Sequence, residues 1–247
     1  MEENEKRPPR PRLRQLHDVE RATAKKARES WHMFTIMAEF IEATEQLSEL
    51  RPAVSIFGSA RIKPEDPYYQ KGVEIARRLS DAGLAVISGG GPGIMEAANK
   101  GAFEGKSLSV GLNIQLPREQ VSNIWQDISL SFRHFYARKV AFVKYADAYV
   151  VLPGGFGTLD EMTEVLTLIQ TGKTRRIPVI LVGIAFWRGL IDWFQNTLVK
   201  NGMIDPADLD IVQLIDEPAH VVDAIFAFYE ERDFEPSDDE KQKALYL

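Results

Sequence analysis

The sequence predicts an α/β fold: a doubly wound, mainly parallel sheet with an N-terminal helical extension. After residue 52, short apolar runs bounded by turn residues alternate with helix-like segments. Glycine-rich turns follow three of these apolar runs. A chain of 247 residues is long enough to bury such a sheet within one large domain.

The chain begins with two segments that precede the predicted sheet. Residues 1–18 combine charge with several prolines, so we expect a disordered arm. Residues 19–50 contain no Gly or Pro, and large apolar residues recur there at helical spacing, which predicts an amphipathic helix. This helix needs a surface to cover, either the domain core or a second subunit.

The domain itself is expected over residues 51–232. Five segments have the apolar pattern of buried strands: AVSIFGS, LAVISGG, LSVGLNI, AYVVLPGG and IPVILVG. Helices are predicted between or after them at 67–82, 93–104, 135–146, 158–171 and 186–200. DIVQLID and PAHVVDAIFAFYEE add a last strand and a closing helix, and residues 233–247 form an acidic tail that we expect to fray. This Rossmann-like alternation places ligands at the carboxyl ends of the strands.

Composition narrows the possible partners and the location. The net charge of -6 argues against bulk nucleic-acid binding but permits a local basic pocket. No cysteine is present, so disulfides and thiolate chemistry are excluded. No apolar run reaches the length of a membrane span and no secretory leader is recognisable, so we expect a cytoplasmic protein without a membrane partner.

Several common site motifs fail in detail. GGGPGIME carries Glu96 where the dinucleotide-binding motif needs a glycine, and TGKT has Thr167 where a P-loop needs its first glycine. The four histidines have no metal-ligand spacing, and no recognisable lysine arrangement suits pyridoxal phosphate. We therefore expect neither a metal nor another cofactor.

Glycine turns at three strand ends are the first candidate site. Carboxyl ends of parallel strands share one edge of the sheet, and backbone N–H groups at a helix start bind phosphate, so three turns together favour an anionic ligand. The candidate contacts are Gly58 and Ser59, then Gly89, Gly90 and Gly91, and then Gly154, Gly155, Gly157 and Thr158.

A basic segment, SFRHFYARK, precedes the third turn and predicts a strand end that leads into a helix. Arg133, Arg138 and Lys139 are candidate cations for a phosphate, although a solvated basic helix face would have the same composition. Its aromatic residues and those that follow are expected in the core rather than in base stacking: Phe132, Phe135, Phe142 and Tyr145.

Glu161 has two possible roles. Thr158 and Glu161 have the spacing of a capping box, in which both side chains satisfy backbone N–H groups at a helix start. Alternatively, the carboxylate stabilises positive charge on a sugar or activates water, beside turns that hold the phosphate of the same ligand. A sugar phosphate whose glycosidic bond breaks needs both an anion site and a carboxylate.

The motif PGGFGTLDE with ARK upstream resembles the PGGxGTxxE and RK motifs of the LOG (Lonely Guy) family, cytokinin riboside 5'-monophosphate phosphoribohydrolases often mislabelled lysine decarboxylases. The resemblance runs over about residues 53–215. It implies that Arg138 and Glu161 form the catalytic pair, that Lys139 and residues 154–158 contact phosphate and ribose, and that Glu119 contacts substrate. The substrate would be a nucleoside 5'-monophosphate, AMP or an N6-substituted AMP.

Two departures from the compact family pattern indicate its longer bacterial form: residues 1–50, and GGGPGIMEAANKGA in place of GGGxxGLMG. That form implies a homo-oligomer, a dimer at least, with a hexamer as the larger alternative. Two other functions stay open: a carrier of molybdenum cofactor or nucleotide with the same fold, which would not need both Arg138 and Glu161, and a nucleotide sensor that signals through the long helix.

Overall fold

The structure is a computed structural model that describes residues 19–116 and 121–230, with side chains described from residue 25 onward. The predicted arm, the acidic tail and Glu119 lie outside the described residues.

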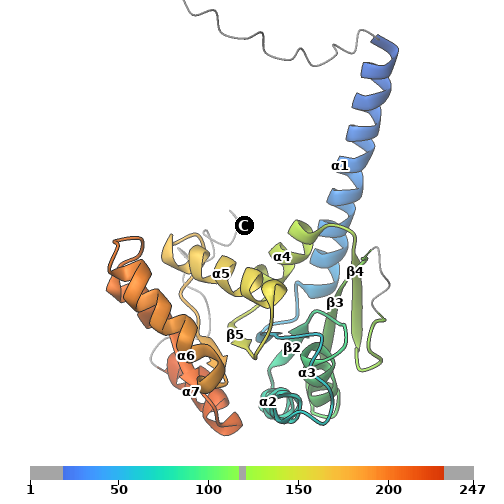
Figure 1. The fold of residues 1–247 in the computed structure, drawn as a ribbon. Coiled ribbons are helices and arrows are strands. Elements are labelled where there is room, and N and C mark those ends of the chain that lie inside the picture. The colour runs from blue at the N-terminus through green and yellow to red at the C-terminus, as the bar shows by residue number, and fades with distance from the viewer. Residues whose placement is uncertain (1–18, 117–120, 231–247) are drawn as a thin grey trace, which may run out of the picture.

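Seven parallel strands form one sheet in the order β4-β3-β2-β1-β5-β6-β7 (Figure 1). The strands are β1 (Ala53–Phe57), β2 (Ala85–Ser88), β3 (Ser109–Ile114), β4 (Ile128–Phe132), β5 (Ala148–Val151), β6 (Val179–Val182) and β7 (Val212–Ile215). Strands β2 to β4 are added on one side of β1, and β5 to β7 on the other side. The strand order therefore reverses between β1 and β5, which pair in parallel from Val54–Ala148 to Phe57–Val151. This is the switch point at which such sheets bind ligands, and it confirms the predicted doubly wound fold.

Helices cover both faces of the sheet (Figure 1). They are α1 (Val19–Leu47), α2 (Pro67–Asp81), α3 (Ile94–Phe103), α4 (Phe135–Lys144), α5 (Phe156–Gln170), α6 (Ile184–Trp193) and α7 (Pro218–Glu230). A π-helical turn (Phe194–Val199) continues α6, and a 3-10 helix (Pro206–Ile211) precedes β7. Buried side chains of α2, α3 and α7 form the core on one face. Those of α4, α5, α6 and the end of α1 form the core on the other.

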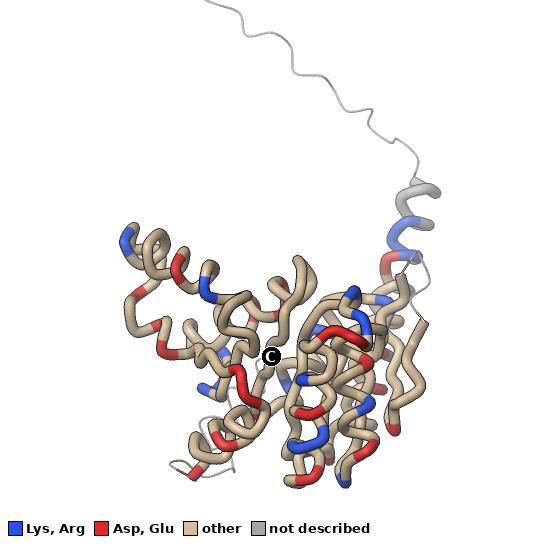
Figure 2. The backbone as a smooth tube through the Cα atoms, turned by 60° about the horizontal axis from the view of Figure 1, so that its bottom comes forward, with Lys and Arg blue, Asp and Glu red and all other residues tan. Residues whose placement is uncertain are grey.

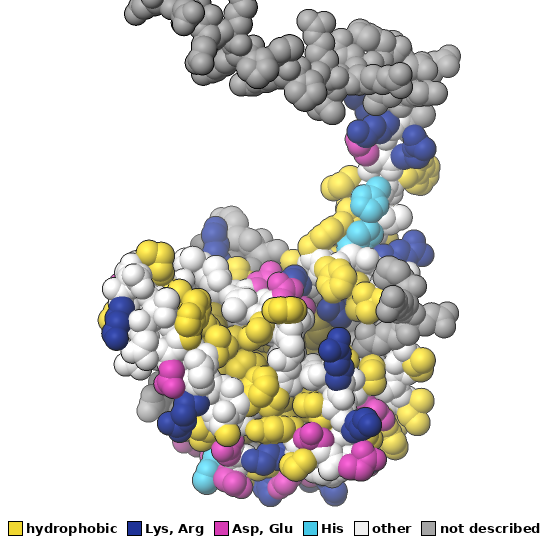
Figure 3. All heavy atoms as spheres, in the orientation of Figure 1, with side chains coloured by type: hydrophobic (Ala, Val, Ile, Leu, Met, Phe, Trp, Pro, Cys, Tyr) yellow, Lys and Arg dark blue, Asp and Glu magenta, His cyan; other side chains and the backbone are white. Residues whose placement is uncertain are grey.

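The helix α1 is only partly attached to the domain. Its buried side chains, Ile36, Glu39, Ala43 and Leu47, belong to its second half. Closer to its N-terminus, Trp31 is 72% and Phe34 59% exposed. The first half of the helix extends beyond the domain as a stem, and hydrophobic side chains lie along it (Figures 1 and 3). Within the described chain, no helix combines the length and apolar character that a bilayer span requires.

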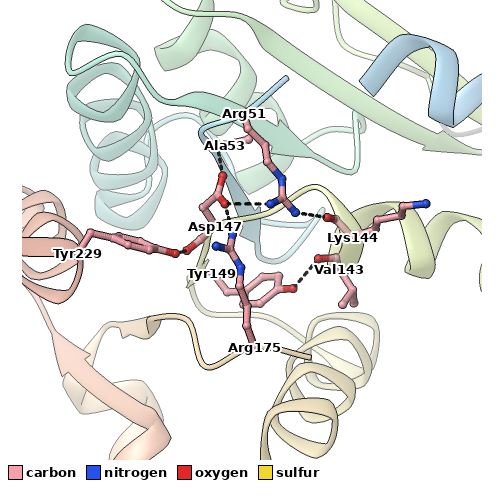
Figure 4. A network of polar contacts seen from close by, with 8 residues as sticks. All are labelled: Arg51, Ala53, Val143, Lys144, Asp147, Tyr149, Arg175 and Tyr229. Atoms are coloured by element: carbon pink, nitrogen blue, oxygen red, sulfur yellow. Dashed lines mark hydrogen bonds and ion pairs between the residues drawn. The ribbon is translucent and has the colours of Figure 1, made fainter. Parts of the chain in front are cut away.

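A buried carboxylate, that of Asp147, contacts several segments at the amino ends of the central strands (Figure 4). The glycine turns lie at the opposite, carboxyl ends of the strands. Asp147 precedes β5 and accepts a 2.8 Å hydrogen bond from the backbone N–H of Ala53 at the start of β1. It also pairs with Arg175 and lies 3.9 Å from Arg51, and its carbonyl accepts from Tyr229 of α7. The contacts of Asp147 thus join the segments that lead into β1, β5 and β6 with α7, and both guanidinium groups compensate its buried charge.

Two features of the fold differ from the sequence prediction. The segment ISLSF forms a complete edge strand, β4, where only a strand end was expected; its alternating apolar and polar residues carried the period-two signal. Helix α5 begins at Phe156 rather than near residue 158.

Charged residues of both signs are interspersed along the elements (Figure 2).

Candidate functional site

A cavity of about 710 Å³ opens at the carboxyl ends of β1 and β5, within the size range of small-molecule sites. The turn after β1, the turn after β2, the first turn of α4 and the start of α5 all contribute to its wall. Of the predicted site residues, it brings together Gly58, Ser59, Gly89, Arg138, Gly155, Gly157, Thr158 and Glu161.

Arg138 and Glu161 form the charged pair of this cavity. Arg138 lies on the first turn of α4 and Glu161 on the second turn of α5. Their side chains approach with Nη2 3.5 Å from Oε1, and are only 12% and 9% exposed. The two helices therefore place opposite charges together in a largely dehydrated wall, where electrostatic interactions are stronger than in water.

The environment of Glu161 shifts its titration into the neutral range. Burial raises the pKa of this carboxyl to about 7, although the positive charges of Arg138 and Lys139 act in the opposite direction. A carboxyl with this pKa is present in both protonation states at neutral pH. It can therefore accept or donate a proton during a reaction, as a general acid or base requires.

The guanidinium of Arg138 contacts two aromatic rings, and one of its nitrogen atoms has no hydrogen-bond partner among the described residues. Burial lowers the pKa of its guanidinium, and the carboxylates of Glu161 and Asp160 act against that effect. The guanidinium lies 5.3 Å from the ring of Phe135 and 5.5 Å from that of Phe142. Its Nε is buried without a hydrogen-bond partner among the described residues. A buried donor of this kind is costly unless a ligand acceptor completes it.

The capping-box interpretation of Glu161 is wrong. Gly155 is the N-cap of α5 and no side chain caps this helix, so Thr158 is its third residue and Glu161 its sixth. The reason is the glycine turn itself, which starts the helix before Thr158 is reached. The first N–H groups of a helix have no intrahelical partner, and at α5 they lie at the cavity, where they suit an anion.

Gly154 has a packing role within the third turn and is not among the residues that line the cavity. A β-carbon at this position would collide with the side chain of Thr158. Thr158 is itself buried against the cavity. The absence of a side chain at residue 154 thus allows the close turn that brings the start of α5 over the end of β5.

The second glycine turn contributes less than the sequence suggested. Gly89 lines the cavity, whereas Gly90 and Gly91 do not. The carbonyl of Gly90 accepts from Asn123 N at 2.8 Å and from Gln126 Nε2 at 2.9 Å, and that of Gly91 accepts from Asn123 Nδ2 at 3.0 Å. These two glycines are therefore anchored to the segment that leads to β4.

Lys139 is directed away from the cavity lining. Its Nζ lies 2.9 Å from Asp160 Oδ2 and 2.7 Å from Glu164 Oε2, both on α5. Partial burial lowers the pKa of Lys139, but hydrogen bonds to Glu164 and Asp160 outweigh that effect and raise it. The acidic residues after the glycine turn thus have a partner in Lys139, which is not among the residues that line the cavity. Its predicted contact with substrate stays a prediction.

The apolar wall of the cavity was not predicted from the sequence. Phe132, Phe142 and Tyr145 are buried as expected, but Phe135 is 49% exposed and lines the cavity, so its assignment to the core is wrong. Its position at the start of α4, directly after an edge strand, was the available signal. Other lining residues that were not singled out are Ile56, Phe57, Ala60, Arg61, Met95, Ile114, Leu116, Phe156 and Leu159. Within the described residues, no group of three His, Asp or Glu side chains is arranged to hold a metal ion.

The chain matches a known protein family. A family model described as "Possible lysine decarboxylase" matches residues 95–225, just over half of the chain. The match includes Arg138, the third glycine turn and Glu161.

Curated relatives carry an enzymatic name. The cytokinin riboside 5'-monophosphate phosphoribohydrolase LOG3 of Arabidopsis thaliana is 27% identical over 170 residues, covering 68% of this chain and 78% of that protein. The enzyme LOG of Oryza sativa subsp. japonica, with the same activity in its name, is 30% identical over 163 residues, covering 65% and 66%.

Solved structures with the same fold include molybdenum cofactor proteins. The molybdenum cofactor binding protein of Rippkaea orientalis superposes with a TM-score of 0.54 at 20% identity, covering 72% of this chain and 96% of that one. The molybdenum cofactor carrier protein of Chlamydomonas reinhardtii gives 0.53 at 20% identity, covering 72% and 98%. At this identity the likeness concerns the fold alone.

Proposed function

Because the chain belongs to the LOG family, whose model is described as "Possible lysine decarboxylase", we propose that it is a hydrolase acting on a purine nucleoside 5'-monophosphate. The substrate is AMP or an N6-substituted AMP, and the products are the free base and ribose 5-phosphate. The observation that carries the proposal is the pairing of Arg138 with a carboxyl of neutral pKa, Glu161, inside one cavity.

The phosphate binds at the start of α5. There the uncapped N–H groups of the helix and the positive end of its dipole favour an anion. The first turn, with Gly58 and Ser59, lies on the same cavity wall. Arg138 adds a positive charge, and its unpartnered Nε–H is a donor for an oxygen of the substrate.

Glu161 acts on the ribose. The bond from C1' to the purine nitrogen breaks, the electron pair leaves with the base, and a water oxygen bonds to C1'. Glu161 accepts the proton of that water, and its negative charge stabilises the cationic sugar in the transition state. The departing base takes up a proton from solvent at a ring nitrogen, and Glu161 then releases its proton to solvent, so that one water is consumed in each turnover. The raised pKa makes the carboxylate a stronger base than an exposed glutamate.

The remaining wall suits a purine. Met95, Phe135 and Phe142 supply apolar and aromatic surface next to the charged pair. Such surface favours a flat ring over another charged group, because it cannot replace the hydration of a charge. Both adenine and an N6-substituted adenine are retained as candidates for the base.

The decarboxylase name does not fit the residues. Pyridoxal phosphate chemistry needs a lysine that forms a Schiff base within the site. The described residues that line the cavity include no lysine, and the ammonium of Lys139 is paired with Asp160 and Glu164. A carrier of molybdenum cofactor remains the alternative, but a carrier that cuts no bond does not need both Arg138 and Glu161 in its cavity.

The direct test incubates the purified full chain with a panel of nucleoside 5'-monophosphates, including AMP and N6-substituted AMP, and measures the released base by chromatography. Release of base together with an equal amount of ribose 5-phosphate supports the hydrolase. Tight binding of a panel member without release would instead favour the carrier.

A further inference from the structure

A buried carboxylate of the N-terminal helix lies at the start of the helix that carries Arg138. The side chain of Glu39, on α1, is only 9% exposed. Its Oε1 accepts hydrogen bonds of 3.0 Å from the backbone N–H of Arg133 and from Nδ1 of His134. Its Oε2 accepts a longer bond, 3.4 Å, from the backbone N–H of His134.

Helix α4 has no cap of its own. His134 is its N-cap residue, its side chain makes no capping bond, and the first turn contains no acidic residue. Glu39 supplies both missing features from 95 residues away in the chain: acceptors for N–H groups at the helix start and a negative charge at the positive end of the dipole. The ring of His32, also on α1, packs edge-on against that of His134, with centroids 4.8 Å apart. It thus adds a second contact between α1 and the N-terminus of α4.

The N-terminus of α4, which Glu39 contacts, lies one helical turn before Arg138. The N–H of Arg138 donates to the carbonyl of His134 at 3.3 Å, so the two residues are joined by the first hydrogen bond of α4. The guanidinium has few other polar constraints, since its Nε has no described partner and its contact with Glu161 is 3.5 Å long. Its place in the cavity therefore depends on where α4 begins and how it is oriented.

We propose that Glu39 is a positioning residue that fixes Arg138 in the cavity by anchoring the start of α4. This inference rests on the proposed function for its catalytic consequence, but the anchoring itself does not. It also gives the N-terminal helix a role in the site, although none of the described side chains of α1 lines the cavity.

The chain offers a matched control on the same helix. Thr44 of α1 accepts a 3.2 Å hydrogen bond from the hydroxyl of Tyr145, the residue that follows the last turn of α4. Thr44→Val removes a contact between the same two helices, but at the end far from Arg138. General loosening of α1 would affect both variants, whereas positioning of Arg138 concerns only Glu39.

The first experiment observes Arg138 directly in the full chain. Nitrogen-15 labelling of arginine gives a spectrum of side-chain Nε–H groups, in which Arg138→Lys identifies the buried signal. Glu39→Gln, which keeps the size but removes the charge, is expected to shift or broaden that signal, and Glu39→Ala more so, while Thr44→Val leaves it in place. An Arg138 signal unchanged in both Glu39 variants would overturn the proposal, whether or not the protein is a hydrolase.

The second experiment measures kcat/KM with AMP, or with the best nucleotide of the panel, in a double-mutant cycle. A displaced catalytic group costs on the order of tenfold or more, which we expect for Glu39→Gln, with a larger loss for Glu39→Ala and a near-normal value for Thr44→Val. In an Arg138→Lys background the Glu39→Gln loss should shrink to about twofold, because the two residues act through one interaction.

Additive losses in the cycle, or equal losses in the Glu39 and Thr44 variants, would show that Glu39 does not act through Arg138. If the wild-type chain releases base from no nucleotide, the proposed function fails, and the arginine spectrum alone decides the positioning role.

Discussion

Nη2 of Arg138 lies 3.5 Å from Oε1 of Glu161, and both side chains are nearly excluded from solvent. Helix α4 brings one charge and α5 the other, and the glycine turn between β5 and α5 allows the approach. A buried ion pair is a poor source of stability, so this arrangement supports the catalytic role proposed for the two residues.

The 5'-phosphate is expected to be essential for efficient hydrolysis. Without it, the start of α5 and the Nε of Arg138 have no anion to bind. Adenosine should therefore have a much lower kcat/KM than AMP, by about a hundredfold or more if two charge-assisted hydrogen bonds of roughly 1.5–3 kcal/mol each are lost. Chromatographic assays of both compounds give the comparison, and equal values would remove the phosphate from the proposed site.

The pH dependence should show an acidic limb. If Glu161 acts as a base, the ionised form is active, so kcat/KM rises as pH increases through about 7 and falls as the carboxyl becomes protonated below it. The charge of Arg138 lowers the pKa of Glu161, so Arg138→Gln should move this limb to higher pH. Rates between about pH 3.5 and 9 measure both effects, and a limb near the ordinary glutamate value of 4.5 would mean that another group is the base.

The family motif and the observed geometry lead to different predictions for Lys139. The motif predicts that it contacts the phosphate, whereas its ammonium pairs with Asp160 and Glu164. Following the geometry, we expect Lys139→Met to change the KM for AMP less than threefold, on the order of a surface ion pair, and Arg138→Met to raise it much more. Steady-state kinetics of the two variants decide the matter, and a large rise in KM for Lys139→Met would favour the motif.

Sequence and structure agree where the pattern is local. The strands and glycine turns follow from apolar runs and turn residues, and parallel strands bring those turns to one edge whatever the details of packing. The direction of Lys139 was not predictable in this way, because neighbouring residues on a helix point about 100° apart and the orientation of α4 decides which one faces the cavity. That orientation depends on the Glu39 contact, which joins residues 95 positions apart.

The role of Glu161 was also beyond the sequence pattern alone. Its spacing from Thr158 matches a capping box, and only the start of α5 at Phe156 excludes that role. The start depends on the packing of Gly154 against Thr158, a contact within a turn that spacing rules do not describe. The catalytic role of Glu161 comes from the family resemblance and stays a prediction.

The exposed apolar face of α1 is expected to bind another copy of the chain. Trp31, Phe34, Met37 and Ile41 are each more than half exposed. Apolar side chains grouped in this way usually mark an interface. Light scattering at micromolar concentration should give the mass of a dimer or a larger oligomer. Trp31→Ser with Phe34→Ser should lower that mass, while Glu45→Gln, an exposed site on the same helix, should not. The mass of a single chain for the wild type would contradict the prediction.

Replacement of Glu161 tests the chemistry itself. Glu161→Gln keeps the shape of the side chain and removes its charge and its basicity. Turnover of AMP should fall by roughly 10²- to 10⁴-fold, the scale for loss of a general acid or base. The variant should still fold and bind AMP, because the phosphate contacts at the start of α5 do not involve this carboxyl. Base release under single-turnover conditions and calorimetric binding measure the two properties separately.

Glu164→Gln is the matched control, since it alters a carboxylate on the same helix that pairs with Lys139 and does not line the cavity. Its turnover should stay within about threefold of wild type, as expected for loss of a partly exposed ion pair. If both variants lose activity equally, general electrostatics of α5 rather than a specific role of Glu161 would explain the effect. Near-normal hydrolysis by Glu161→Gln would leave a nucleotide-binding cavity in which neither water activation nor stabilisation of the sugar cation depends on this residue.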